Sequence, residues 1–162
     1  IIGELSSFSQ PGQNIKEPVD INGILGDLVR ISRESLQQRA GIDLELKLDQ
    51  NIPLVSSDSN KLKQVFINLM KNAVEAMSDG GTVSFETRYR DGEPPSAEVL
   101  VSDQGKGIPE AVQATLFEPY TSSKGHEGLG LAIVHSAVRE LGGKLSYQTG
   151  DKGTTFLVQL PL

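Results

Sequence analysis

The stretch NLMKNAVEAM, from Asn68 to Met77, indicates the helix on which the fold depends. At about 100° per residue, the apolar side chains of this stretch and of the residues before it share one flank. They are Leu62, Val65, Leu69, Ala73 and Ala76, with Phe66 and Met77 at the margin. Such a stripe is typical of a helix that packs one side against a core. Asn68, Asn72 and Glu75 form a second, narrow stripe along its edge.

Two asparagines four residues apart inside a helix need an explanation, because asparagine prefers caps and turns. A polar amide beside a buried face is costly unless a partner satisfies it. One interpretation is that both side chains hydrogen-bond to neighbouring backbone. The other is that the Asn72 oxygen binds a hard cation such as Mg²⁺, which typically takes one or two protein ligands together with substrate phosphates and water. The helix alone does not decide between them.

The composition is that of an ordinary globular chain. Its 162 residues suffice for one domain that buries roughly 68–70% of its unfolded surface. The net charge of −6, with both signs interspersed, argues against nucleic acid or an anionic membrane as a partner. The chain has no cysteine and no apolar run long enough to span a membrane. We therefore expect this part of the chain to be cytoplasmic without direct membrane contact, although a full-length protein could be membrane-bound.

The spacing of apolar residues predicts the other elements. The first two predicted helices are the end of a truncated helix over 1–8 and a helix that is capped by Asp20 and ends at Gly41. The helix that contains Asn68 and Asn72, called the asparagine helix below, is expected to end at Asp79–Gly81. A short helix from Pro109 to about Phe117 and a helix over 129–141 follow. Predicted strands are 42–48, 83–90, 97–102, and a hairpin of 145–149 and 154–160 around Gly150–Gly153. The stretch up to Pro18 is expected to be a linker, and 49–58 a loop. Several strands have one polar face, which favours an α+β two-layer sandwich with helices packed on one face of a mixed sheet.

Two glycine-rich segments could hold a ligand. DQGKGIP begins at Asp103, where the third strand ends, and its glycines allow close backbone approach. An acid at a strand end can accept a hydrogen bond from an exocyclic amine such as that of adenine; the alternative is an ordinary turn with a solvated aspartate. GLGLAI, from Gly128, opens a helix, where free amides and the helix dipole favour phosphate oxygens. The alternative is a helix start with packing glycines, and neither segment is a Rossmann or Walker motif.

In this order, the segments resemble the ATP-binding catalytic domain of sensor histidine kinases, within the gyrase–Hsp90–histidine kinase–MutL superfamily. NLMKNAVEAM resembles the asparagine box, DQGKGIP the first glycine box, LFEPYTSSK (116–124) the phenylalanine box, GLGLAIV (128–134) the second glycine box and GTTF (153–156) a third. The resemblance covers roughly 15–162 and implies a Bergerat-type ATP-binding fold with a mixed, mostly antiparallel sheet. Residues 1–14 would then be the tail of a truncated dimerisation and phosphoacceptor hairpin, with its linker.

The resemblance implies a site for ATP and Mg²⁺. The implied ATP-binding residues are Asn68, Asn72, Asp103, Gly105, Gly107, Ile108, Phe117, Lys124, Gly128, Leu129, Gly130, Leu131 and Thr154. Asn72 would bind Mg²⁺, with Asn68 beside it as a second ligand of the ion or a contact to phosphate. Asp103 would recognise the adenine amine, with Thr154 nearby. The two glycines after Asp103 would line the adenine end, Phe117 would anchor the base of the lid, and Lys124 and the amides of the second glycine box would bind phosphates.

The family's phosphoacceptor is missing from this sequence. Neither His126 nor His135 lies in the family's motif of histidine and acid followed by proline, and His135 is expected at a surface or boundary. The chain would therefore be the ATP-binding part of a protein histidine kinase that does not phosphorylate itself and carries no catalytic residue of its own. The implied partners are its own histidine hairpin and a downstream response regulator receiver domain, with no nucleic acid.

Other functions remain open at this point. ATP hydrolases of the gyrase or MutL type use a glutamate where this chain has Asn68, and an amide cannot act as that base. A serine protein kinase of the same superfamily has a similar domain. A third hypothesis is a domain without catalysis that binds nucleotide weakly or serves only as a docking module, and the complete set of Asn72, Asp103 and glycines disfavours it.

Overall fold

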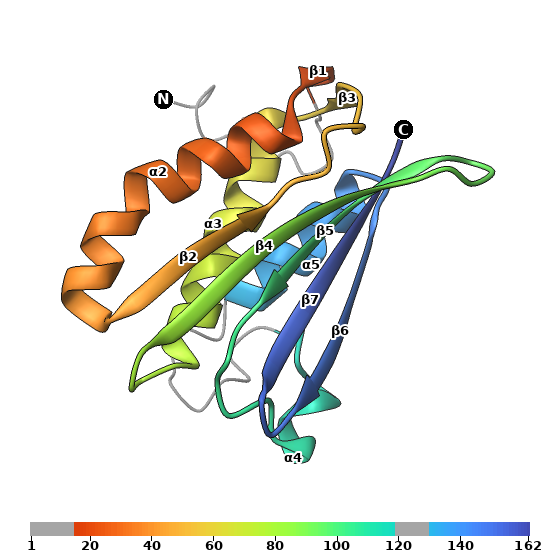
Figure 1. The fold of residues 1–162 in the computed structure, drawn as a ribbon. Coiled ribbons are helices and arrows are strands. Elements are labelled where there is room, and N and C mark those ends of the chain that lie inside the picture. The colour runs from red at the N-terminus through yellow and green to blue at the C-terminus, as the bar shows by residue number, and fades with distance from the viewer. Residues whose placement is uncertain (1–14, 119–129) are drawn as a thin grey trace, which may run out of the picture.

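One mixed five-stranded sheet, covered on one face by helices, forms the core of the molecule (Figure 1). The computed structural model describes residues 15–118 and 130–162. The strand order is β2 (Ile42–Lys47), β4 (Gly81–Arg90), β5 (Ser96–Ser102), β7 (Gly153–Pro161) and β6 (Lys144–Gly150). Only the β2–β4 pair in this sheet is parallel. The predicted two-layer α+β fold is confirmed.

Three helices supply the second layer: α2 (Ile21–Ala40), α3 (Ser59–Glu75) and α5 (Gly130–Glu140). The predicted apolar stripe of α3 is buried at Leu62, Val65, Phe66, Leu69, Met70 and Ala73. It packs with alternate residues of the strands, such as Phe85 and Phe156, in one core. Phe66, expected at the margin, is fully buried, and Met70 is a core residue that the pattern did not predict.

Side-chain caps determine where the helices begin. The Asp20 side chain accepts a hydrogen bond from the Gly23 N–H at 3.1 Å, as predicted. The Asp58 side chain caps α3, accepting hydrogen bonds from the N–H groups of Asn60 at 3.0 Å and Lys61 at 3.2 Å. Gly41 ends α2 in the left-handed conformation, with φ of 63°.

The predicted linker and loop contain a small two-stranded sheet instead. In it, β1 (Glu17–Val19) pairs antiparallel with β3 (Val55–Ser57). Strands of three residues are too short for an alternating pattern, so the sequence did not indicate them. The pair is fastened to the start of α3, because the Ser59 hydroxyl donates to Glu17 Oε1 at 2.7 Å and the Ile15 N–H to Asp58 Oδ2 at 3.3 Å.

Two helix ends differ from prediction. Helix α3 ends at Glu75 with Ala76 as its cap, before the predicted Asp79–Gly81, and the chain then tightens through a bond from the Met77 N–H to the Val74 oxygen. The short helix α4 covers only Glu110–Gln113, with Pro109 as its cap instead of its first residue. Its predicted continuation towards Phe117 consists of turns with bonds between residues three apart.

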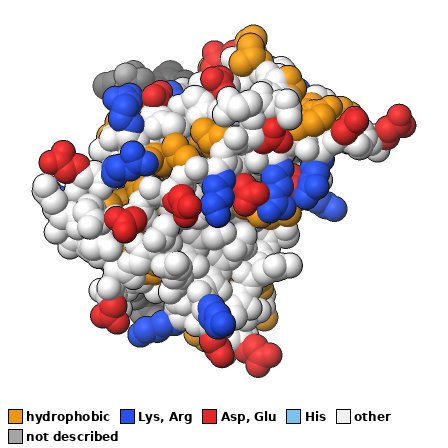
Figure 2. All heavy atoms as spheres, viewed as in Figure 1, with side chains coloured by type: hydrophobic (Ala, Val, Ile, Leu, Met, Phe, Trp, Pro, Cys, Tyr) orange, Lys and Arg blue, Asp and Glu red, His pale blue; other side chains and the backbone are white. Residues whose placement is uncertain are grey.

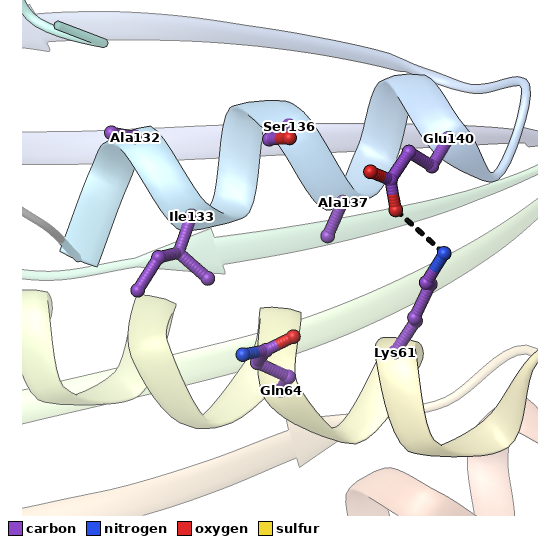
Figure 3. A pocket seen from close by; sticks show the side chains of 7 residues that line it. All are labelled: Lys61, Gln64, Ala132, Ile133, Ser136, Ala137 and Glu140. Atoms are coloured by element: carbon purple, nitrogen blue, oxygen red, sulfur yellow. Dashed lines mark hydrogen bonds and ion pairs between the residues drawn. The ribbon is translucent and has the colours of Figure 1, made fainter. Parts of the chain in front are cut away.

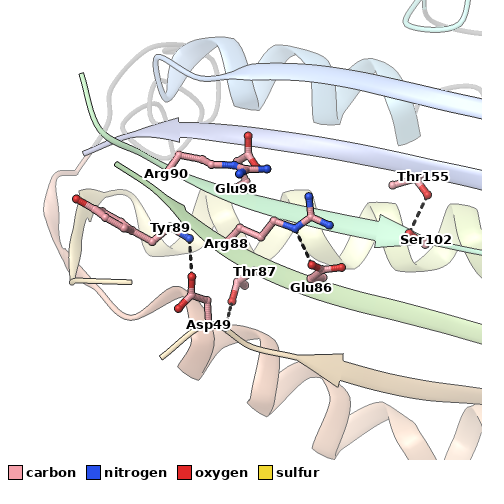
Figure 4. A network of polar contacts seen from close by, with 9 residues as sticks. All are labelled: Asp49, Glu86, Thr87, Arg88, Tyr89, Arg90, Glu98, Ser102 and Thr155. Atoms are coloured by element: carbon pink, nitrogen blue, oxygen red, sulfur yellow. Dashed lines mark hydrogen bonds and ion pairs between the residues drawn. The ribbon is translucent and has the colours of Figure 1, made fainter. Parts of the chain in front are cut away.

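The other face of the sheet is polar. Seen from the sheet side, acidic and basic side chains lie intermixed (Figure 2). Figure 4 shows the ion pairs Arg88–Glu86 at 2.6 Å and Arg90–Glu98 at 2.8 Å, and the hydroxyl contact between Ser102 and Thr155 at 2.8 Å. The helices thus cover one face and leave the other to solvent. Within the described ranges, no helix combines the length and apolar character needed to cross a membrane.

Candidate functional site

Asp103 lies directly after β5 and is held rigidly by backbone groups. The residue is 8% exposed. Its Oδ1 accepts hydrogen bonds from the N–H groups of Gly105 at 2.8 Å and Thr154 at 3.2 Å. Burial raises the pKa of this carboxyl, and the two backbone hydrogen bonds partly offset that effect. No residue of the described ranges donates to Oδ2, so this oxygen can accept a hydrogen bond from a ligand.

Two glycines let the loop after Asp103 pass close to other backbone. A Cβ atom on Gly105 would overlap the carbonyl oxygen and the side chain of Ala76, at the end of α3. Gly107 has φ of +82°, and a Cβ atom there would overlap the Gly150 oxygen at the end of β6. The loop is therefore wedged between the asparagine helix and the β6–β7 turn, and glycine is required at both positions.

A threonine pair connects this loop to the sheet. The Thr149 hydroxyl accepts a hydrogen bond from the Ile108 N–H at 2.8 Å and lies 2.8 Å from the Thr154 hydroxyl. Thr154 is buried and its N–H bonds to Asp103. Thr149 was not among the predicted site residues. Its position opposite Thr154 in the predicted hairpin was the signal that could have identified it.

The two asparagines of α3 differ in their environments. The Asn68 amide donates to the Gln64 carbonyl of its own helix at 2.8 Å, which matches the interpretation of backbone bonding. Asn72 is half-buried, and the structure gives its side chain no hydrogen bond to any residue of 15–118 or 130–162. Its amide oxygen is therefore available, which fits the donor that a hard cation requires.

Helix α5 runs antiparallel to α3 beside it (Figure 3). The Lys61 Nζ near the start of α3 lies 2.6 Å from Glu140 Oε2 at the end of α5. The first residues of α5, Gly130 and Leu131, therefore lie toward the half of α3 that carries the two asparagines. This arrangement brings the N-terminal amides of α5 and the Asn72 amide to the same end of the helical layer. Lys124, Gly128 and Leu129 lie outside the described residues.

A groove of about 320 Å³ lies between the first half of α3 and most of the length of α5. Its walls are formed by Lys61, Gln64, Ala132, Ile133, Ser136, Ala137 and Glu140 (Figure 3). None of the residues predicted to bind ATP lines it. The candidate site is therefore formed by the ends of β5, β6 and α3 and the start of α5, and this groove is a separate surface.

Phe117 follows α4 and packs on the hydrophobic core. Its ring meets the Tyr147 ring edge-on, with 6.0 Å between centroids. Because Tyr147 lies on β6 two residues before Thr149, Phe117 packs beside the same part of the sheet as the loop after Asp103. The described site residues thus form two groups. One group contains Asp103 and Phe117, and the other contains Asn72 and Gly130.

Comparison with known proteins identifies the family. Residues 57–162 match the family model described as "Histidine kinase-, DNA gyrase B-, and HSP90-like ATPase". Sporulation kinase A of Bacillus subtilis is 35% identical over 165 residues, which cover 99% of this chain and 26% of that kinase. This chain thus spans about a quarter of the length of that relative.

Two solved structures support the same assignment. Full-length ShkA in complex with AMPPNP matches with a TM-score of 0.79 and 27% identity, over 90% of this chain and 31% of that one. Histidine kinase ThkA in complex with response regulator protein TrrA matches with a TM-score of 0.77 and 25% identity, over 99% of this chain and 46% of that one. The predicted family is confirmed, and the chain belongs to the histidine kinase-, DNA gyrase B- and HSP90-like ATPases.

Proposed function

We propose that this chain binds Mg-ATP and presents its γ-phosphoryl group to a histidine on a hairpin outside residues 15–162, as the kinase part of a two-component sensor. The observation that carries the proposal is Asp103, a buried carboxyl with one oxygen held by two backbone N–H groups and the other available. This is the arrangement needed to recognise an exocyclic amine at a fixed position. Residues 1–14 would belong to the tail of the hairpin and its linker.

The remaining residues divide between the two ends of the nucleotide. Gly105, Gly107 and Ile108 would line the adenine end, with Thr154 and Phe117 beside it. The amides of Gly128, Leu129, Gly130 and Leu131 and the Lys124 ammonium group would bind phosphates. Phosphoryl transfer depends mainly on positioning and charge neutralisation, so a site without a nucleophile of its own suits this role.

Asn72 would hold Mg²⁺, with Asn68 as a second ligand of the ion or a contact to phosphate. The assignment of Asn72 is supported by its available amide oxygen and by its position at the same end of the helical layer as the start of α5. When bound, Mg²⁺ would neutralise phosphate charge. The Asn68 amide nitrogen donates one of its two hydrogens to Gln64, which leaves its oxygen for the ion and its second N–H for a phosphate.

The relatives support ATP as nucleotide and a response regulator as partner. The similar structure of ShkA contains AMPPNP, and that of ThkA contains the response regulator TrrA. A serine protein kinase of the same superfamily is the second candidate, because it would use the same nucleotide site. A docking module without catalysis is the third.

The decisive experiment mixes this chain with labelled ATP, Mg²⁺ and the separately produced histidine hairpin of the same protein. We expect acid-labile, base-stable label on the hairpin and none on the chain alone. Acid-stable label on serine, in a parallel mixture that contains a candidate protein substrate instead of the hairpin, would identify the serine kinase. Failure to bind ATP at millimolar concentration would leave only the docking module.

A further inference from the structure

An aromatic stack joins helix α5 to the segment that follows α4. The rings of Phe117 and His135 are nearly parallel, at 8°, with 4.8 Å between their centroids. Phe117 also meets Tyr147 edge-on at 6.0 Å, and Tyr147 contacts Phe156 of β7 at the same distance. Ring pairs with these geometries stabilise by more than the area they bury. His135, expected to be an unremarkable boundary side chain, is thus the outermost ring of a row that reaches the core.

This row is connected to the adenine end of the candidate site. The Tyr147 hydroxyl donates to Gln113 Oε1 at 3.4 Å, and Gln113 Nε2 donates to the Ile108 carbonyl at 2.9 Å. The Ile108 N–H in turn donates to Thr149, whose hydroxyl pairs with that of Thr154. Each contact is made by a part-buried group, so the loop after Asp103 and the Phe117 ring are held in one arrangement.

The same row is connected to the phosphate end. His135 lies on α5 five residues after Gly130, the first residue of that helix. A ring fixed at this position restricts both the rotation of α5 about its axis and its distance from Phe117. The first turn of α5, with the amides proposed to bind phosphates, is restricted with it.

We infer that His135 is a positioning residue for the nucleotide. Its stack on Phe117 holds the first turn of α5 at a fixed distance from the loop after Asp103. The nucleotide spans these two segments, so their spacing must match the distance from adenine to phosphates. The inference rests on the proposed function. In this role His135 acts only through its flat ring, which stacks on Phe117. It neither contacts ATP nor transfers a proton.

The test measures binding of AMPPNP with Mg²⁺ by calorimetry and of adenosine by NMR titration, for the chain with His135→Ala, His135→Phe and Arg139→Ala. Adenosine contacts only the adenine end, whereas AMPPNP needs both ends. We expect His135→Ala to weaken AMPPNP binding about three- to tenfold, the range of one lost ring stack, and adenosine binding by less than about twofold. His135→Phe restores a flat ring and is expected to bind AMPPNP like the original chain. Arg139→Ala removes an exposed side chain one helical turn further on and serves as the matched control.

A double-mutant cycle gives an independent measurement. If the two rings act as one unit, Phe117→Leu combined with His135→Ala weakens AMPPNP binding no more than the larger single effect. Additive effects, equal losses for adenosine and AMPPNP, or failure of His135→Phe to restore binding would each overturn the inference. If the unaltered chain does not bind AMPPNP, it is the proposed function that fails. If His135→Ala does not fold, AMPPNP binding by His135→Phe is compared with that by His135→Leu. Leucine fills space without a flat ring, so the comparison still isolates the effect of the stack.

Discussion

At the residue scale, Asn72 is a polar side chain that helix α3 places beside a packed core without a hydrogen bond from the described residues. Its polar atoms are not buried, so the amide oxygen can exchange water for a bound cation. Asn68, one turn earlier, has its amide nitrogen satisfied within the helix. The two asparagines share one stripe of the helix but differ in their hydrogen bonds.

Replacing Asn72 with alanine is expected to remove most of the gain in ATP affinity that Mg²⁺ provides, roughly tenfold or more, because the ion loses a protein ligand. Calorimetric titration with and without Mg²⁺ measures this gain directly. Asn60→Ala, at an exposed position near the start of the same helix, is the control. An Mg²⁺-dependent gain that persists in Asn72→Ala would contradict the assignment.

Two aspartates show how burial changes the effect of the same hydrogen bonds. Asp49 accepts from the backbone N–H groups of Tyr89 and Asn51, and these bonds lower its pKa (Figure 4). Asp103 also accepts two backbone bonds, yet burial outweighs them and its pKa is raised. A carboxyl whose pKa is raised in the folded state makes the fold less stable as pH rises from its ordinary value of 3.8 through the raised value.

Asp103→Asn is therefore expected to separate stability from recognition. The asparagine oxygen can keep both backbone bonds without a buried charge, so thermal stability at neutral pH should be equal or higher. The stability difference from the original chain should shrink as pH falls through the raised pKa, where Asp103 becomes neutral. Thermal unfolding followed at several pH values measures this difference. If Asp103→Asn is less stable than the original chain at neutral pH, or if the stability difference does not shrink in acid, the expectation is wrong.

The same variant is expected to lose about tenfold or more of the preference for ATP over GTP, because the charged acceptor for the adenine amine is gone. Competition binding with the two nucleotides measures the preference. If the unaltered chain binds ATP and GTP equally well, Asp103 does not recognise adenine.

At the element scale, the loop after β5 depends on how closely α3 and the β6–β7 hairpin approach each other. Gly107→Ala must accommodate a side chain at positive φ and against the Gly150 carbonyl, so it is expected to cost at least about 1 kcal/mol of stability and to weaken nucleotide binding. Gly26→Ala, in the middle of α2 with open space around it, is expected to stabilise the fold by about 0.5–1 kcal/mol. Denaturant unfolding compares the two. Equal effects of both changes would show that the loop tolerates a side chain.

Elements of six residues or more were predictable because their apolar side chains repeat with a clear period. The stripe from Leu62 to Ala73 and the alternation from Val83 to Thr87 indicated both the element and its buried face. The short strands β1 and β3 carry no such signal. Helix α3 ends early because its last turn tightens at Ala76, where Gly105 packs, and that contact joins residues far apart in the sequence.

Part of the candidate site belongs to local motifs that the sequence displays. The structure places Asp103 directly after β5 and Gly105 and Gly107 in the loop that follows, and their roles in nucleotide binding stay predictions. Thr149, Gln113 and His135 belong to no such motif, since each matters only through a partner supplied by another element. Asn68 shows the opposite case, where a residue in the motif bonds to its own helix.

At the scale of the whole molecule, nucleotide binding should be visible as added stability. A ligand at a hundred times its dissociation constant adds about 2.7 kcal/mol. For a chain of this size that raises the melting temperature by roughly 5–11 °C. Differential scanning fluorimetry with AMPPNP and Mg²⁺ measures the shift, with GTP and inorganic triphosphate as comparisons. No shift with any nucleotide would favour the docking module.

The β1–β3 pair has a mechanical consequence for the asparagine helix. Glu17 holds the hydroxyl of Ser59, and the Ile15 N–H holds the carboxyl that caps the same helix. A pull or twist applied to the chain at Ile15 would therefore act first on the cap of α3, a helix of 17 residues about 25 Å long. Asn72 lies in the last turn of that helix, so one continuous element connects the tethered start of the chain with the proposed cation ligand.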